Sequence, residues 1–201
     1  MTIMLKITKA GNHGILLPQL GIGLDYSGKK ADHVFVSHGH ADHIPWKSYA
    51  KSVYATPPTK KFMNLRGAKY EVQELPFKQS VETKNAKITF YPAGHILGSA
   101  MTFVESEFGN LLYTGDYRNP PSPATEGFEL PDTQIDTFIT EATFSLPVYK
   151  WQSYDELKAE IMGFAKSALD KDYTPVLVST DCFSWHIIWA KRRKSCIWLK
   201  T

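Results

Sequence analysis

Three histidines and an aspartate lie within the seven residues from Ser37 to His43, which read SHGHADH. Imidazole nitrogens and carboxylate oxygens are the side-chain atoms that hold divalent zinc, manganese or iron in proteins. The candidate ligands in this heptapeptide are His38, His40, Asp42 and His43. A pattern of this kind supplies enough ligands for two neighbouring ions, which can share and activate one water. The heptapeptide therefore predicts a two-metal centre for hydrolysis.

Three residues further away extend this candidate site. His95 lies in PAGHILGSA and Asp116 in YTGDY, and each follows an expected strand and a glycine that allows a sharp turn. Asp25 also follows an expected strand, and we expect its carboxylate to orient a ligand imidazole. A simple turn at Asp25 is the alternative. The histidines expected to be ordinary packed or turn residues are His13, His33 and His186.

These candidates need a framework of short strands to position them. Segments rich in Ile, Val, Phe, Tyr and Thr, separated by turn residues, predict strands over much of the first 140 residues. The expected strands are 3–7, 22–25, 33–37, 53–55, 70–75, 87–91, 101–104, 111–114 and 137–140. A helix is expected after Thr56, and a longer one after Ser153, where Ser153 and Glu156 form a capping box. A buried strand at 175–179 completes a layered α/β pattern.

A basic stretch follows the heptapeptide directly. Residues 44–70 contain six basic side chains and no acidic one. These are Lys47, Lys51, Lys60, Lys61, Arg66 and Lys69. A basic surface beside a hydrolytic site would suit a polyanion such as a nucleic acid. An ordinary solvated face is the simpler interpretation of the same stretch.

Size and composition predict one cytoplasmic domain. The chain has 201 residues, of which 43% are hydrophobic, and a net charge of +3. It has no apolar run of about eighteen residues, and its N-terminus lacks a signal-peptide pattern. We expect the domain to cover residues 1–180 and residues 181–201 to form an atypical tail without strand or helix. That tail holds three of the five tryptophans and both cysteines, Cys182 and Cys196, which we expect to be free thiols.

Several of these motifs resemble a known family. SHGHADH, PAGHILGSA and YTGDY are similar to successive signatures of the metallo-β-lactamase fold. GHILGSA, TGDY and ITEATF resemble the β-CASP nucleases, among them ligase-associated exonucleases and the nucleases that process mRNA 3′ ends. The resemblance covers about residues 10–180. It implies a metallo-β-lactamase-like αββα sandwich that hydrolyses RNA or DNA phosphodiesters through a metal-activated hydroxide.

The resemblance also implies roles for individual residues. His38, His40 and His95 would hold one divalent ion, Asp42 and His43 would hold a second, and Asp116 would bridge the two. The implied ions are Zn²⁺, with Mn²⁺ as the alternative. Asp42, Asp25 and Glu141, the last from ITEATF, would be the catalytic carboxylates.

The chain departs from the family pattern near its end. Family members carry an inserted β-CASP domain and two later histidines, whereas this sequence stops at Thr201. We therefore expect an incomplete fold, its N-terminal portion, with sheet edges that a partner or a second copy covers. Whether the chain is an active enzyme stays open. The alternatives to a nuclease are another hydrolase of this fold, such as a thioesterase, and an inactive metal-binding remnant.

Overall fold

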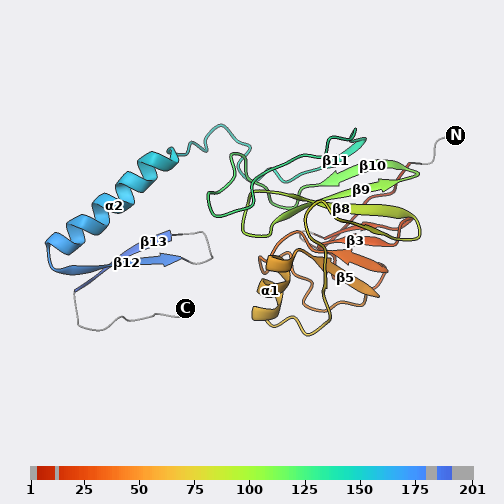
Figure 1. Ribbon diagram of the computed structural model, residues 1–201, viewed down its shortest axis with the longest axis horizontal. Coiled ribbons are helices and arrows are strands. Elements are labelled where there is room, and N and C mark those ends of the chain that lie inside the picture. Colours follow the sequence, from red (N-terminus) through yellow and green to blue (C-terminus); the bar gives the residue numbers. More distant parts are fainter. Residues whose placement is uncertain (1–3, 12–13, 180–184, 192–201) are drawn as a thin grey trace. The chain divides into compact units, whose positions relative to one another are not determined.

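The computed structural model describes residues 4–11, 14–179 and 185–191 (Figure 1). The chain divides into two compact units, Met1–Glu141 and Ala142–Thr201. None of the helices in the described ranges is long and apolar enough to cross a membrane. The boundary expected at residue 180, like Cys182 and Cys196, lies outside the described residues.

The first unit begins with a six-stranded sheet whose strands lie in chain order. Its strands are β1 (Thr8–Ala10), β2 (Gly14–Leu17), β3 (Ile22–Leu24), β4 (His33–Phe35), β5 (Ser52–Ala55) and β6 (Gln73–Glu74). Strands β1 to β3 are antiparallel, and β3 to β6 are parallel. The parallel part brings the C-terminal ends of β3, β4 and β5 to one edge of the sheet.

A second, five-stranded sheet has the order β11-β10-β9-β8-β7. Its strands are β7 (Ser80–Glu82), β8 (Ala86–Pro92), β9 (Ala100–Ser106), β10 (Gly109–Tyr113) and β11 (Thr137–Ile139). Strands β8 and β10 are both antiparallel to β9, and β11 is parallel to β10. Strands β8, β10 and β11 therefore run in one direction and end at the same edge.

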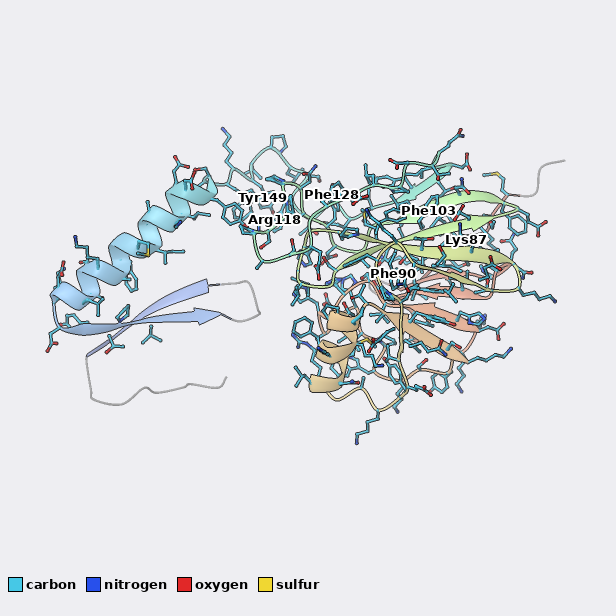
Figure 2. All side chains as sticks on the ribbon, viewed as in Figure 1. Lys87, Phe90, Phe103, Arg118, Phe128 and Tyr149 are labelled. Atoms are coloured by element: carbon cyan, nitrogen blue, oxygen red, sulfur yellow. The ribbon has the colours of Figure 1, made fainter. Side chains whose placement is uncertain are left out.

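The two sheets pack against each other around a shared apolar core. The ring of Phe35 from β4 stacks on Tyr54 at 5.0 Å and meets Phe90 from β8 edge-on at 6.1 Å. Figure 2 labels Phe90 in this layer and Phe103, which belongs to a separate cluster with Met101 of the same strand. Successive side chains along a strand point to opposite faces of the sheet, so one strand can contribute apolar residues to two clusters.

Helix α1 (Pro57–Leu65) covers the outer face of the first sheet. Thr56 caps the helix, its hydroxyl accepting a hydrogen bond from the Thr59 amide, and two prolines occupy the first turn. Met63 is fully buried in the cluster that also contains Val34 of β4. The helix expected after Thr56 is confirmed, and mixed sheets with few helices confirm the α/β class.

The strand expected at residues 3–7 is wrong, because the first strand is β1. In the β1–β2 register Thr8 lies opposite Leu16, so Lys6 would lie opposite Pro18. Proline has no N–H group and ends the ladder. The Gln19 side chain replaces it, accepting from the Lys6 amide at 2.6 Å and donating to the Met4 carbonyl at 3.0 Å. Strands β2 and β7 were not expected, and β6 is shorter than the expected 70–75.

The second unit contains α2 (Tyr154–Asp170), β12 (Tyr173–Ser179) and β13 (Trp185–Lys191). Both halves of the capping box expected at Ser153 and Glu156 are present, which confirms the helix start. Strand β13 pairs antiparallel with β12, in a stretch for which no strand was expected. The apolar side of α2 is mostly uncovered: Ala168 is buried, but Leu169 is 50% exposed.

Candidate metal centre

The candidate ligands gather where strands of both sheets end. Asp25 follows β3, His38 follows β4, His95 follows β8 and Asp116 follows β10. The Ala100 amide of β9 donates a hydrogen bond of 2.8 Å to the Ser37 carbonyl, which joins the two sheets at this edge. Parallel strands deliver their end residues to one place, so sheet topology explains the convergence.

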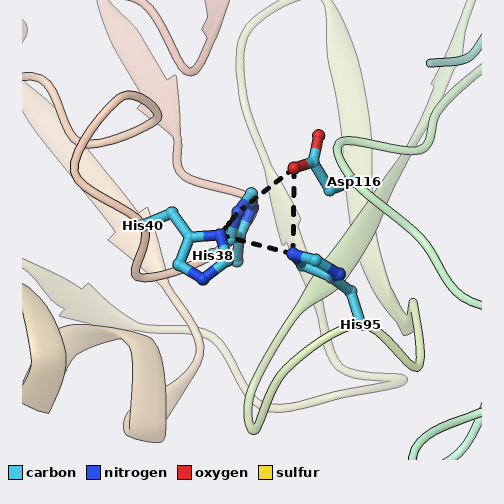
Figure 3. A group of neighbouring side chains, drawn as sticks. All are labelled: His38, His40, His95 and Asp116. Atoms are coloured by element: carbon cyan, nitrogen blue, oxygen red, sulfur yellow. Dashed lines mark hydrogen bonds and ion pairs between the residues drawn. The ribbon is translucent and has the colours of Figure 1, made fainter. Parts of the chain in front are cut away.

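Four residues form a group that could hold a metal ion: His38, His40, His95 and Asp116 (Figure 3). The Nδ1 atom of His40 lies 2.9 Å from His38 Nε2 and 3.3 Å from His95 Nε2. Asp116 Oδ2 lies 3.8 Å from Nε2 of both His38 and His95. Ligand atoms around a tetrahedral zinc ion are about 3.3 Å apart, and these separations bracket that value. The donor set and its spacing therefore fit a divalent ion.

The other oxygen of Asp116 faces His43, which in turn lies near Asp42. Asp116 Oδ1 lies 3.5 Å from His43 Nε2, and Asp42 Oδ2 lies 4.0 Å from the same nitrogen. His43 is buried, whereas the Asp42 side chain is 59% exposed. Asp116 thus lies between two sets of candidate ligands. Its Oδ2 atom faces His38 and His95, and its Oδ1 atom faces His43.

Asp25 lies behind the ligands and sets their protonation. It is 6% exposed and accepts hydrogen bonds from the Ser37 amide at 2.7 Å, the Ser37 hydroxyl at 2.6 Å and His43 Nδ1 at 2.8 Å. An ionised carboxylate can only accept, so His43 carries its proton on Nδ1. The Nε2 lone pair of His43 then points toward Asp116.

Ser37 extends the same effect to a second histidine. Its hydroxyl oxygen lies 3.0 Å from His38 Nδ1, and its single proton is donated to Asp25. The hydroxyl therefore accepts from His38 Nδ1–H, which leaves His38 Nε2 unprotonated on the side of the group. One buried carboxylate orients two candidate ligands in this way, as is usual for histidines that hold metals.

Sequence reasoning did not identify Ser37 or Tyr113. The Tyr113 hydroxyl donates a hydrogen bond of 2.9 Å to Asp25 Oδ2. Burial raises the pKa of Tyr113, with the charge of Asp25 adding to this, so the hydroxyl keeps its proton. Both residues sit inside quoted motifs, SHGHADH and YTGDY, but only the tertiary structure brings them to Asp25.

The pKa values of the centre reflect buried, crowded charges. Burial, followed by the charges of Glu141 and Asp42, raises the pKa of Asp116 despite the opposing effect of His43. Burial and the neighbouring His40 lower the pKa of His95 to about 4. Burial lowers the pKa of His43, but the hydrogen bond and charge of Asp25 outweigh it and raise the pKa above 6.5. A bound cation would relieve the carboxylate crowding that raises the Asp116 pKa.

Two glycines let the chain turn into the centre. Gly94 and Gly115 precede His95 and Asp116 with φ angles of 71° and 55°. A Cβ atom on Gly115 would lie 2.6 Å from the Ser37 Cβ atom, so this turn also packs against the residue that supports His38. The expected arrangement of strand, glycine and candidate ligand is confirmed at both positions.

Glu141 and the basic stretch have contrasting surroundings. Glu141 lines a cavity of about 160 Å³ together with His43, Tyr113 and Asp116. In the basic stretch, Lys51 is paired with Asp32 at 2.9 Å and Lys60 with Glu74 at 3.2 Å, so acidic residues from outside the stretch neutralise part of its charge. The exposed basic residues are Lys47, Lys51, Lys61, Arg66 and Lys69.

The chain is similar in sequence to several known proteins. The chain is 34% identical over 171 residues to a probable DNA ligase of Opitutus terrae, covering 83% of this chain and 16% of that protein. It is 34% identical over 141 residues to an RNase J-like protein of Methanocaldococcus jannaschii, covering 60% and 33%. It is 28% identical over 165 residues to the 5′ exonuclease Apollo of Rattus norvegicus, covering 75% and 30%.

The chain thus spans from 16% to 33% of the length of these relatives. No family model matches the chain. A solved protein of unknown function from Enterococcus faecalis is 19% identical, covers 46% of this chain and 27% of its own, and has a TM-score of only 0.39. The sequence matches, and not that structure, show that the chain is homologous to nucleases of the metallo-β-lactamase/β-CASP family.

Proposed function

We propose that this chain is part of a metal-dependent nuclease that hydrolyses phosphodiester bonds in RNA or DNA. The observation that carries the proposal is the position of Asp116, whose two oxygens face His38 and His95 on one side and His43 on the other. A relative named RNase J-like protein supports RNA as a substrate, and a relative named 5′ exonuclease supports cleavage of a nucleic acid.

The proposed ligand sets follow the two sides of Asp116. His38, His40 and His95 would hold one ion, and Asp42 and His43 a second, with Asp116 shared. When bound, the two divalent ions supply Lewis acidity and an activated water for attack on phosphorus. Zinc is proposed first because imidazole nitrogens predominate, with manganese as the alternative favoured by the carboxylates.

Asp25 and Ser37 determine which nitrogen of each neighbouring histidine carries a proton. Asp25 keeps a proton on His43 Nδ1 and, through the Ser37 hydroxyl, on His38 Nδ1. Neutral imidazoles with few carboxylates leave a loaded centre with net positive charge, which attracts a phosphodiester and stabilises the charge that develops during attack. We propose a catalytic role for Asp42, which is exposed beside His43. We propose a second catalytic role for Glu141, which lines the cavity of about 160 Å³ together with His43 and Asp116.

We further propose that the two packed sheets with α1 are the N-terminal portion of a metallo-β-lactamase-like αββα sandwich extending to about residue 180. The support is the layer order of helix, sheet and sheet in the first unit. One outer helical layer is present there as α1, on the sheet that carries His38.

The test is a cleavage assay on end-labelled single-stranded RNA and DNA with added zinc or manganese. We expect the wild-type chain to cleave at least one substrate and Asp42→Asn to lose the activity. His33→Gln is the control, because His33 is a histidine of the same sheet outside the metal group. Equal cleavage by the wild type and Asp42→Asn would contradict the proposal. Metal binding without cleavage would favour the inactive remnant.

A further inference from the structure

A cavity of about 410 Å³ lies beside the candidate metal centre. Its lining includes Asp25 and Asp42 as well as Trp46, Lys47 and Tyr49. Since Asp42 also lies 4.0 Å from His43, the cavity is adjacent to the candidate ligands. Its volume is within the range of pockets that bind small organic groups.

Two aromatic side chains of this cavity are strongly exposed. Trp46 is 55% exposed and Tyr49 is 54% exposed. The backbone that carries them is nevertheless well anchored, because Ile44 is buried in the apolar cluster and the Tyr70 hydroxyl donates a hydrogen bond to the Pro45 carbonyl. The rings therefore stand on a fixed segment and offer flat apolar faces.

Positive charge accompanies these rings. The Lys29 ammonium group lies 5.1 Å from the centre of the Tyr49 ring. Lys47, which lies between Trp46 and Tyr49 in the sequence, is also exposed. The acidic lining residues, Asp25 and Asp42, lie 2.8 and 4.0 Å from His43, a candidate ligand. The cavity thus combines acidic residues beside the candidate metal centre with aromatic rings and cations.

We propose that this cavity is a subsite for one nucleobase of a single-stranded nucleic acid, stacked against Trp46. Aromatic faces with nearby cations are the usual means of binding single strands, because every base has a stacking face and every linkage has a negative phosphate. This inference rests on the proposed function, since a base held here would keep its neighbouring phosphate next to Asp42. Stacking does not select the sugar, so RNA and DNA are separate arms of the test.

The test measures binding of fluorescein-labelled oligothymidylate and oligouridylate by anisotropy, with a chelator present to prevent cleavage. We expect Trp46→Ala to weaken binding of at least one oligonucleotide by about fivefold or more, and Trp46→Phe to retain most of it. Phe138→Ala is the matched control: its ring is also 54% exposed and lines neither cavity. Circular dichroism checks that each variant is folded.

A second measurement separates stacking from phosphate contacts. A single abasic site moved along the oligonucleotide should weaken wild-type binding at one position, and that loss should vanish in Trp46→Ala. Tyr49→Ala should reduce the same loss. An undiminished loss in both variants, or failure of the wild-type chain to bind either oligonucleotide, would overturn the subsite.

The two proposals can fail separately. A chain that cleaves nucleic acid but binds equally well with Trp46→Ala would refute the subsite alone. A chain that binds through Trp46 but never cleaves with metal would refute the nuclease activity alone.

Discussion

His40 occupies the middle of the candidate centre, with its Nδ1 atom next to both His38 and His95. We predict that His40→Ala will lose at least one bound ion per chain, because a three-ligand set can no longer hold the metal with the same geometry. Elemental analysis after dialysis measures this directly. His33→Gln should keep the wild-type metal content, and retention of full metal content by His40→Ala would contradict the assignment of the group.

Ser37 acts on the centre only through its neighbours. We predict that Ser37→Ala will lower zinc affinity by about 10- to 100-fold, the usual effect of removing a residue that orients a ligand histidine. Competition with a chromogenic chelator gives the affinity. Tyr113→Phe removes a hydrogen bond to the same carboxylate without touching a histidine, so its effect should be smaller. Wild-type affinity in Ser37→Ala would disprove the relay from Asp25.

His95 makes the metal-free protein sensitive to acid. Its pKa is about 4 in the folded chain and about 6.5 when unfolded, so the unfolded chain binds more protons between these values. Stability of the metal-free protein should therefore fall as the pH drops from about 6.5 to about 4. His43 has a raised pKa and opposes this trend, losing its contribution as the pH rises through that pKa.

The contribution of His95 can be isolated with His95→Gln. Urea unfolding in the presence of a chelator, repeated across this pH range, should show a shallower acid loss in the variant than in the wild type. Identical pH profiles would show that the buried imidazole is not the source of the effect.

The strand-to-loop turns are the elements that aim the ligands. We predict that Gly115→Ala will destabilise the protein by about 3 kcal/mol, because a positive φ strains the alanine and its Cβ atom would overlap Ser37. Gly67→Ala is the matched control, with a φ of 91° and open space around the position. It should cost only about 1 kcal/mol. Equal losses of unfolding free energy would exclude the contact with Ser37 as the cause.

A second element-level feature holds the loop that contains His95. The Thr56 and Thr59 hydroxyls at the start of α1 donate to the Gly98 carbonyl at 2.6 and 3.0 Å, and the Gly98 amide donates to the Glu126 carboxylate. Within the loop, the amides of His95 and Ile96 donate to the Ser99 hydroxyl. Hydrogen bonds from the loop backbone to two separate segments and to Ser99 within the loop explain how a loop residue becomes a positioned ligand.

At the scale of the whole molecule, every candidate ligand belongs to the first unit. We predict that a chain ending after Glu141 will bind metal with the stoichiometry of the 201-residue chain, as measured by elemental analysis and calorimetric titration. The 201-residue chain is the reference for both measurements. A truncated chain that is folded but metal-free would show that residues 142–201 contribute to the centre.

The expectation that a partner or second copy covers apolar surface stays a prediction. In the second unit, Met162 and Leu169 on α2 are at least half exposed. Phe144 and Trp151, which precede the helix, are more than half exposed. Surfaces of this kind favour association. Sedimentation at several concentrations would measure it.

Much of the fold was predictable where local physics decides it. The capping box at Ser153, the prolines at the start of α1 and most core strands follow from local patterns, because caps and alternating apolar residues act over a few positions. The strand at β1 was misplaced because its limits depend on Pro18, a residue of the facing strand. Pairing partners are not visible in a local pattern.

The sequence by itself determined the kinds of ligands, their order and their family, since the chemistry of His and Asp in SHGHADH, GHILGSA and YTGDY does not depend on folding. Only the tertiary structure decided that His95 and Asp116 lie next to the heptapeptide. It also decided that Ser37 and Tyr113 donate hydrogen bonds to Asp25, and that the exposed Trp46 lines a cavity together with Asp42. The physical reason is sheet topology: strands that run in one direction bring their ends to a single edge, whatever distance separates them along the chain.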